Sequence, residues 1–293
     1  MPSCSPPARL ERARPLLGTR VAVSVGGLAS AAAHRAIDAA FGEVARIHAL
    51  MSFHDSASEL SRLNRSAAEG PVAVDPLTFE TIDKALRLAA ASDGAFDPTV
   101  GAAVIRAGAL PEPAGAPRAD PAADWRDVQL HPAAGTVSFT RPLRLDLCGI
   151  AKGFAVDRAV SALQEAGAVI GLVNAGGDLR VFGAPERIAL RTGAELDDVA
   201  PLLELADGAA ASSGDLGAAG EDPPMAVHLA GARSRRRRGR FTCVAAPECV
   251  WADGLTKVVL ARGARSAATL RAFGARAYVL SPDRGWRSYG AAA

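Results

Sequence analysis

The sequence predicts an α+β protein in which antiparallel or mixed sheets are flanked by helices. Residues 16–25 alternate β-branched and other residues before two glycines, a pattern typical of a strand. Residues 30–50 and 76–92 repeat apolar side chains every three or four positions, as amphipathic helices do. Two short apolar runs, 128–130 and 136–139, are separated by a turn-forming stretch and predict a hairpin.

The composition is that of a soluble globular protein. The 293 residues are 49% hydrophobic and 22% charged, which suits a sizeable core in one large domain or two smaller ones. The net charge of +2 gives no reason to expect a nucleic-acid partner. No run of about 18 apolar residues occurs, so we expect no membrane span. Four cysteines without metal-site or disulfide spacing, and no apolar signal core, predict a cytoplasmic location.

The N-terminal part is expected to begin with a disordered segment, because residues 1–14 are polar and contain prolines. Two interpretations are open for the serine-rich stretch 51–66: a short helix with Ser58 as its N-cap, or a ligand-facing loop. Farther along, Asp75 followed by Pro76 is typical of a helix start.

The stretch 143–183 carries the densest set of candidate site residues. We expect a strand at 143–147, a turn and helix around Lys152, a second strand at 169–173 and a turn at 174–178. Both turns place polar side chains beside glycines, where backbone N–H groups can bind a phosphate. The residues alone therefore predict an anionic ligand here.

Other segments follow from the same signals. Residues 107–124 are rich in alanine, proline and glycine, and residues 220–240 contain a run of arginines, so both are expected to be surface loops. Strands are predicted at 187–191 and 241–245, and the chain should close with a strand or hairpin over 275–289.

A late helix carries the second candidate site. Asp253 and Thr256 are three residues apart, which puts a carboxylate and a hydroxyl on one helix face as a candidate metal site. The alternative is an exposed aspartate and a threonine that bonds back to its own helix. The chain has no P-loop, GxGxxG, HExxH or GxSxG motif, so these two sites carry the functional argument.

Several stretches together resemble the ApbE-type FAD:protein FMN transferase family. They occur in the family's order along nearly the whole chain, and the stretches from 145 and from 172 are the most specific. They are LGTRV (17–21), SELSRLN (58–64), GAFDPTVG (94–101), LDLCGIAKGFAVDRA (145–159), LVNAGGDLRVFG (172–183), SSGD (212–215) and VAAPECVWADGLTK (244–257).

This resemblance implies a single T-fold-like α+β domain over residues 15–293 that binds FAD. It also implies an activity: with Mg²⁺, the enzyme cleaves the FAD pyrophosphate, transfers FMN to a threonine hydroxyl of an acceptor flavoprotein and releases AMP. Mg²⁺ prefers oxygen ligands, and the resemblance assigns these to the Ala151 carbonyl, Asp253 and Thr256.

The resemblance likewise assigns FAD-binding and catalytic roles. Lys152 is expected to face a phosphate oxygen, and His228 is the candidate base, with a rim histidine on a loop as the alternative. The remaining residues expected near FAD are Glu59, Asp97, Asp157, Asn174, Gly176, Gly177 and Asp178.

Two departures from the family pattern bear on activity. After His228, the aspartate and proline that the family often shows are missing, and an arginine run follows. In the late helix, Lys257 stands where many relatives carry a threonine four residues after the aspartate, and an ammonium cannot ligate Mg²⁺. Three hypotheses follow: an active flavin transferase, an FAD-binding protein without transferase activity, or an FAD pyrophosphatase that yields FMN and AMP.

Overall fold

The computed structural model describes residues 9–191, 199–214, 241–281 and 284–290. Its centre is an eight-stranded sheet in which every pair of neighbouring strands is antiparallel. The spatial order is β1-β2-β6-β7-β10-β11-β12-β13. The strands are β1 (Arg9–Leu16), β2 (Thr19–Gly26), β6 (Ile170–Ala175), β7 (Asp178–Phe182), β10 (Ala209–Gly214), β11 (Phe241–Ala246), β12 (Arg276–Ser281) and β13 (Gly285–Gly290).

The first strands correct two predictions. Residues 9–14, predicted to be disordered, belong to β1, which pairs with β2 from Arg9↔Gly26 to Leu16↔Thr19. The single strand predicted at 16–25 is instead the second half of this hairpin, because Leu17 and Gly18 have positive φ values of 54° and 68° and form its turn. The polar composition of 9–14 had suggested disorder, but backbone pairing holds an edge strand regardless of its side chains.

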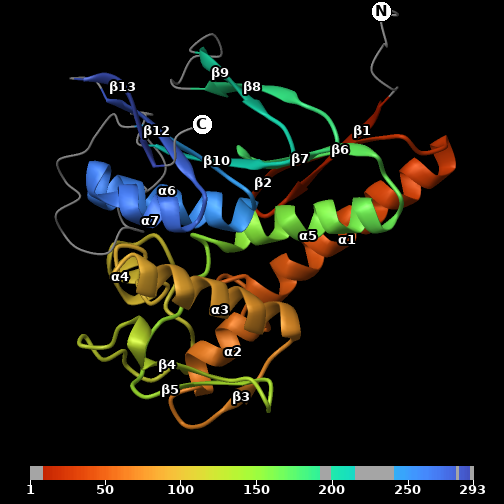
Figure 1. The fold of residues 1–293 in the computed structure, drawn as a ribbon. Coiled ribbons are helices and arrows are strands. Elements are labelled where there is room, and N and C mark those ends of the chain that lie inside the picture. The colour runs from red at the N-terminus through yellow and green to blue at the C-terminus, as the bar shows by residue number, and fades with distance from the viewer. Residues whose placement is uncertain (1–8, 192–198, 215–240, 282–283, 291–293) are drawn as a thin grey trace, which may run out of the picture.

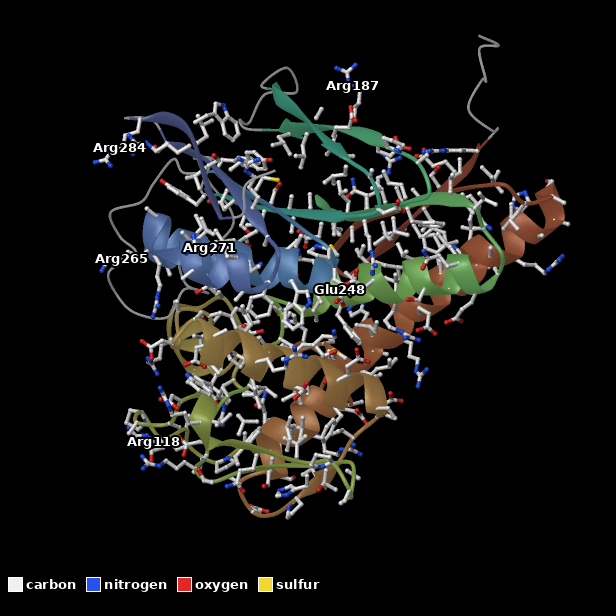
Figure 2. All side chains as sticks on the ribbon, viewed as in Figure 1. Arg118, Arg187, Glu248, Arg265, Arg271 and Arg284 are labelled. Carbon is white, nitrogen blue, oxygen red and sulfur yellow. The ribbon has the colours of Figure 1, made fainter. Side chains whose placement is uncertain are left out.

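One face of the large sheet is covered by helices (Figure 1). These helices are α1 (Ser30–Met51), α5 (Ala151–Glu165), α6 (Cys249–Arg262) and α7 (Ala267–Ala272), with the 3₁₀ turn η4 (Gly263–Ser266) between the last two. The long α1 confirms the helix predicted at 30–50, and its buried face includes Ile37, Phe41 and Val44. Figure 2 shows side chains filling the space between these helices and the sheet, whereas Arg118 and Arg187 point away.

A smaller layer lies beyond the helices (Figure 1). It contains α2 (Glu59–Ser66), α3 (Pro76–Ala91), α4 (Gly101–Arg106), the 3₁₀ turn η1 (Trp125–Asp127) and a sheet of order β3-β5-β4. Its strands are β3 (Val72–Ala73), β4 (Val128–His131) and β5 (Thr136–Phe139). The predicted hairpin and both predicted caps are confirmed: Ser58 accepts from Ser61 N–H at 3.0 Å, and Asp75 accepts from Leu77 N–H at 2.9 Å.

The strand predicted at 143–147 is wrong. This segment forms a single bridge, Val100↔Arg144, and otherwise satisfies its backbone through side chains and loops. The Asn64 side chain accepts from Leu145 N–H at 2.7 Å and donates to the Leu145 carbonyl at 3.0 Å. This apolar run therefore lies in the core without belonging to a sheet, because the buried Asn64 side chain makes the backbone hydrogen bonds that a neighbouring strand would otherwise make.

The predicted loop at 107–124 contains no helix or strand. It is fastened to the domain by Arg144, a buried guanidinium that bonds the Glu112 carboxylate and the Pro117 carbonyl. The second predicted loop, 220–240, lies wholly outside the described residues.

On the opposite face of the large sheet lies a two-stranded ribbon of β8 (Glu186–Arg191) and β9 (Val199–Leu205) (Figure 1). Leu190 and Leu205 from the ribbon pack with Leu179 and Val181 of the sheet. The described residues include no helix that is long and apolar enough to cross a membrane.

Candidate active site

The site begins where α5 meets α6. The backbone N–H of Gly153, in the first turn of α5, donates to Asp253 Oδ2 of α6 at 3.1 Å. An added Cβ at Gly153 would overlap the Cys249 carbonyl oxygen and approach the Asp253 side chain. Glycine is therefore required for this close approach, which brings the two stretches singled out in the sequence together.

Four charged side chains gather at this junction, and we call Lys152, Asp178, Asp253 and Lys257 the four-charge cluster. Lys152 of α5 pairs with Asp178 at the start of β7. Lys257 of α6 pairs with Asp253, four residues earlier on the same helix. Asp178, Asp253 and Lys257 are buried, while the Lys152 side chain remains 35% exposed. Lys152 is thus the member of the cluster best placed to meet a ligand.

Two hydroxyl groups complete the cluster on the sheet side. Ser213 Oγ of β10 and Thr256 Oγ1 of α6 are 2.8 Å apart. Thr256 Oγ1 also donates to the Asp253 backbone carbonyl at 2.7 Å, so the predicted alternative of a threonine bonded to its own helix is observed. Asp253 itself is not exposed, which contradicts the other half of that alternative.

The burial of these charges shifts their proton affinities. Burial, reinforced by the nearby Asp253 charge and opposed by Lys152, raises the pKa of Asp178 to about 6. Burial alone would lower the pKa of Lys152, but the Asp253 and Asp178 carboxylates outweigh it and raise that pKa. At neutral pH, Lys152 is therefore a firmly charged ammonium beside a carboxylate that binds its proton more tightly than usual.

Asp157, expected near the flavin, ties the two helices together in this structure. Its carboxylate accepts from the N–H groups of Cys249 and Val250 at 2.9 and 2.8 Å, and from Arg180 at 2.8 Å. Burial raises the pKa of Asp157, whereas these partners oppose the shift. Glu248, at the N-cap position of α6, makes no side-chain cap bond, so Asp157 caps α6 from a neighbouring helix. Its contact with FAD stays a prediction.

Two further residues that are predicted to contact FAD form hydrogen bonds within the protein. Glu59 Oε2 accepts from Asp75 N–H at 2.9 Å. Asp97 accepts from Thr99 N–H at 2.8 Å and from its hydroxyl at 2.6 Å, and burial raises the pKa of Asp97. These bonds account for the local folding of both motifs, and the FAD-binding roles of Glu59 and Asp97 stay predictions.

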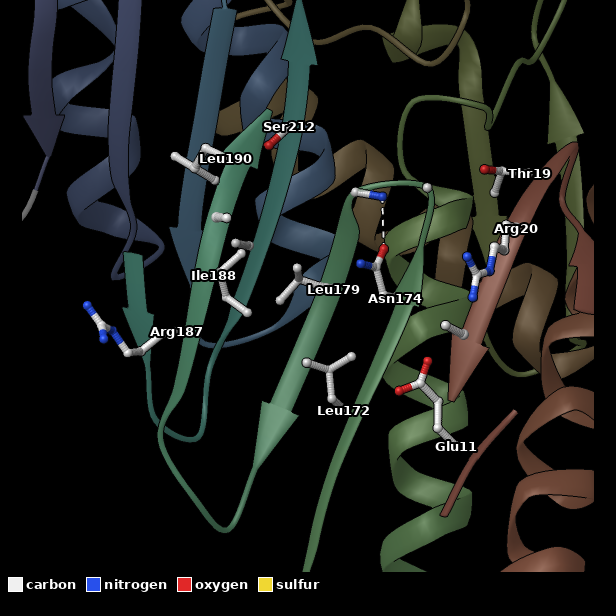
Figure 3. Close-up of a pocket in the computed structure, with 15 residues that line it drawn as sticks. Glu11, Thr19, Arg20, Leu172, Asn174, Leu179, Arg187, Ile188, Leu190 and Ser212 are labelled. Carbon is white, nitrogen blue, oxygen red and sulfur yellow. Dashed lines mark hydrogen bonds between the residues drawn. The ribbon is translucent and has the colours of Figure 1, made fainter. Parts of the chain in front are cut away.

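A pocket of about 820 Å³ lies on the other face of the sheet, beneath the β8–β9 ribbon (Figure 3). The turn between β6 and β7 forms part of its lining, with Gly176 and Gly177 at φ values of 64° and 101°. Asn174 Oδ1 accepts from Gly177 N–H at 2.9 Å and fixes this turn. Thr19, Arg20 and Ser212 also line the pocket.

The predicted site residues therefore divide between two faces of one sheet. Asn174, Gly176 and Gly177 line the pocket, whereas Asp178, the next residue, points to the helix face and joins the four-charge cluster. Side chains alternate along a strand, so a continuous motif in the sequence serves both faces. Ala151 is the first residue of α5, and His228 lies outside the described residues.

Comparison with known proteins identifies the family. The model of the ApbE family matches residues 17–279 of this chain. The chain belongs to the ApbE family. Among curated relatives in that family, "FAD:protein FMN transferase" of Treponema pallidum (strain Nichols) is 32% identical over 197 residues, covering 62% of this chain and 54% of the relative. The protein of the same name from Vibrio cholerae (strain O395) is 34% identical over 178 residues, covering 56% of this chain and 53% of the relative.

Solved ApbE structures share the fold over almost the whole chain. "Flavin Transferase ApbE from Vibrio cholerae" superposes with a TM-score of 0.73 at 25% identity, covering 97% of each chain. The ApbE protein of Thermotoga maritima superposes with a TM-score of 0.78 at 24% identity, covering 96% of this chain and 97% of that one. The predicted α+β ApbE fold is confirmed. The sequence matches to the two curated relatives span about half of their length.

Two contributors to this ApbE site were missed from the sequence. Ser213 lies in the SSGD motif, and strand alternation would have separated its side chain from that of Ser212. Lys257 was noted only as a departure from the family, although its i, i+4 spacing from Asp253 is that of a helical ion pair.

Proposed function

We propose that this ApbE-family protein is an FAD:protein FMN transferase that attaches FMN to a threonine of an acceptor flavoprotein. The observation that carries the proposal is Lys152. Its ammonium lies in the first turn of α5, is paired with buried Asp178 and is still partly exposed. A fixed cation at a helix N-terminus is a setting that favours a phosphate group.

The pocket supports FAD rather than a smaller phosphate ligand. Gly177 lines the pocket, and the next residue, Asp178, belongs to the four-charge cluster. We place the FAD pyrophosphate beside Lys152 and one end of the dinucleotide across the Gly176–Gly177 turn in the pocket. Backbone can approach a ligand closely at this turn, because neither glycine carries a side chain.

The proposed reaction exchanges one P–O bond for another. The threonine oxygen attacks the FMN phosphorus, the bond from that phosphorus to the bridging oxygen breaks, and AMP leaves with the bridging oxygen. The threonine proton passes to a base, for which His228 stays the candidate. Lys152 would neutralise charge on the phosphate oxygens, which is the main requirement of phosphoryl transfer.

The Mg²⁺ implied by the resemblance does not fit the residues as they are arranged. Of the expected ligands, Asp253 is paired with Lys257 and accepts from Gly153 N–H, while the Thr256 hydroxyl donates to a backbone carbonyl. The described residues include no group of three or more His, Cys, Asp or Glu side chains that could hold a metal. We therefore derive no step through Mg²⁺.

The test measures two products from one incubation. The protein is incubated with FAD and a threonine-containing acceptor peptide; intact mass reports added FMN, and chromatography reports AMP. We expect equal amounts of labelled peptide and AMP, and no labelling of a peptide in which alanine replaces threonine. AMP without labelling would indicate the pyrophosphatase, and bound FAD without either product, across a panel of acceptors, would indicate a binding protein.

The chain offers a matched pair of lysine variants. Lys152→Met keeps the side-chain length but removes the charge, and it should lower AMP release by roughly 100-fold. Lys84→Met is the control, because Lys84 lies on α3 and pairs with Glu80 and Glu248, away from the four-charge cluster. Equal activity of both variants would contradict the role of Lys152.

The cytoplasmic location and the absence of a nucleic-acid partner stay predictions from the sequence.

A further inference from the structure

Both oxygens of the Asp253 carboxylate are bonded by groups of its own protein. Oδ2 accepts from Gly153 N–H at 3.1 Å, and Oδ1 pairs with the Lys257 ammonium. The residue is 0% exposed. A buried carboxylate needs a compensating charge, and the described structure supplies that charge from within the chain.

Lys257 is held in this position by several contacts. Its Nζ also donates to the Asp253 backbone carbonyl at 3.1 Å, the same oxygen that accepts from Thr256. Its side chain is only 9% exposed, and an added Cβ at Gly149 would lie 3.6 Å from Lys257 Cε. The ammonium thus sits against the turn that leads into α5 and Lys152.

This placement conflicts with a divalent cation at Asp253. A lysine ammonium has no lone pair for a metal, and a cation on Oδ1 would have to displace it against electrostatic repulsion. Apart from Asp253, the ligands that the resemblance implies are one hydroxyl and one carbonyl, which are both neutral, so the negative charge for a divalent cation would have to come from Asp253 itself.

We propose that Lys257 is a built-in cation that replaces the divalent metal at Asp253, so that this protein binds and cleaves FAD without Mg²⁺. The inference rests on the proposed function and concerns the requirement for a metal in that reaction. The P–O bond changes are those given above, and Lys257 keeps its proton throughout. Its single charge neutralises the Asp253 carboxylate, and the partly exposed Lys152 is the cation that faces the pyrophosphate.

The experiment compares the wild type with Lys257→Thr. Binding of Mn²⁺ to the FAD-free proteins is followed by the electron paramagnetic resonance of free Mn²⁺, and AMP release is measured in EDTA and in Mg²⁺. The wild type should bind no Mn²⁺ at this site, and EDTA should change its AMP release by less than about twofold. Lys257→Thr should bind Mn²⁺, lose AMP release by roughly 100-fold in EDTA and recover it with Mg²⁺.

Two further variants serve as controls. Lys84→Thr removes a lysine outside the site and should respond to metal as the wild type does. Lys257→Arg retains a positive charge and should stay independent of metal. If Lys257→Thr fails to fold, the wild type and Lys257→Arg still decide the matter through their response to EDTA and Mn²⁺.

The outcomes separate this inference from the proposed function. Loss of wild-type AMP release in EDTA, or Mn²⁺ binding by the wild type equal to that of Lys257→Thr, would overturn the built-in cation. If no protein releases AMP or labels an acceptor under any condition, the transferase proposal is wrong. The Mn²⁺ titration then still decides which cation Asp253 holds.

Discussion

Ser212 and Ser213 are neighbours in β10, yet their side chains serve opposite faces of the large sheet. Ser212 lines the 820 Å³ pocket, whereas Ser213 bonds Thr256 on the helix face. Their positions allow ligand binding and helix attachment to be tested separately with two adjacent substitutions.

Ser213→Ala should lower the free energy of unfolding by about 1–2 kcal/mol, because it leaves a buried hydroxyl without its sheet-side partner. Ser212→Ala should leave that free energy within about 0.5 kcal/mol of the wild type and weaken FAD binding severalfold. Urea unfolding and FAD fluorescence titration measure the two effects. Equal loss of stability in both variants would contradict the separation of the faces.

Gly153→Ala tests the close approach of α5 and α6. The added methyl group would overlap the Cys249 carbonyl, so we expect a loss of about 2–4 kcal/mol in unfolding free energy and loss of FAD binding. Gly42→Ala is the control within α1, where an added Cβ meets nothing within 4 Å. There, the higher helix propensity of alanine should add roughly 0.5–1 kcal/mol. Thermal unfolding of both variants decides the comparison.

Asp157→Ala tests the cap that α5 supplies to α6. The substitution leaves two helix N–H groups and Arg180 without their acceptor, so the free energy of unfolding should fall by about 3–5 kcal/mol. Asp38→Ala removes a carboxylate that pairs with Arg12 and Arg14 at the surface, and it should cost less than about 1 kcal/mol. Similar urea midpoints for the two variants would rule out the capping role.

The pH dependence of stability should report Asp178. Its pKa is raised from 3.8 to about 6 on folding, so the folded protein binds the proton more tightly than the unfolded chain. The contribution of Asp178 to stability is therefore complete below pH 3.8 and is lost as the pH rises through about 6. Asp178→Asn cannot titrate; the stability of the wild type relative to this variant should fall by about 2 kcal/mol between pH 4 and 7. Parallel pH profiles from urea unfolding would contradict the raised pKa.

Local signals in the sequence predicted most elements but not how they are paired. Helix caps at Ser58 and Asp75 depend on residues within three positions, so they could be read directly. The segment 143–147 was misassigned because its backbone partner is the Asn64 side chain, more than 80 positions away, and no local pattern reveals such a bond. Residues 9–14 were misassigned because polar composition says little about an edge strand.

For the candidate site, the sequence predicts which residues matter better than it predicts how they are arranged in space. The glycine turns and the Asp253 helix were located correctly, since their residue types are unusual for ordinary loops and helices. To predict that the motif around Asp178 divides between two faces of the sheet, one would have to know the strand register. To predict that Lys257 pairs with Asp253, one would have to know that Asp253 is buried. Both depend on tertiary packing, which fixes where a charge can be solvated.

The contact between Gly153 and Asp253 has a consequence for synthesis of the chain. These residues are 100 positions apart, and Asp157 reaches Cys249 across 92 positions. Contacts this distant in sequence form late and slowly, because the entropy cost of closing a long loop comes before the stabilising contact is made. While the ribosome is still making the middle of the protein, Asp157 of α5 has no helix to cap, because α6 has not yet been made. The junction of α5 and α6, and with it the four-charge cluster, can therefore form only after α6 has emerged from the ribosome.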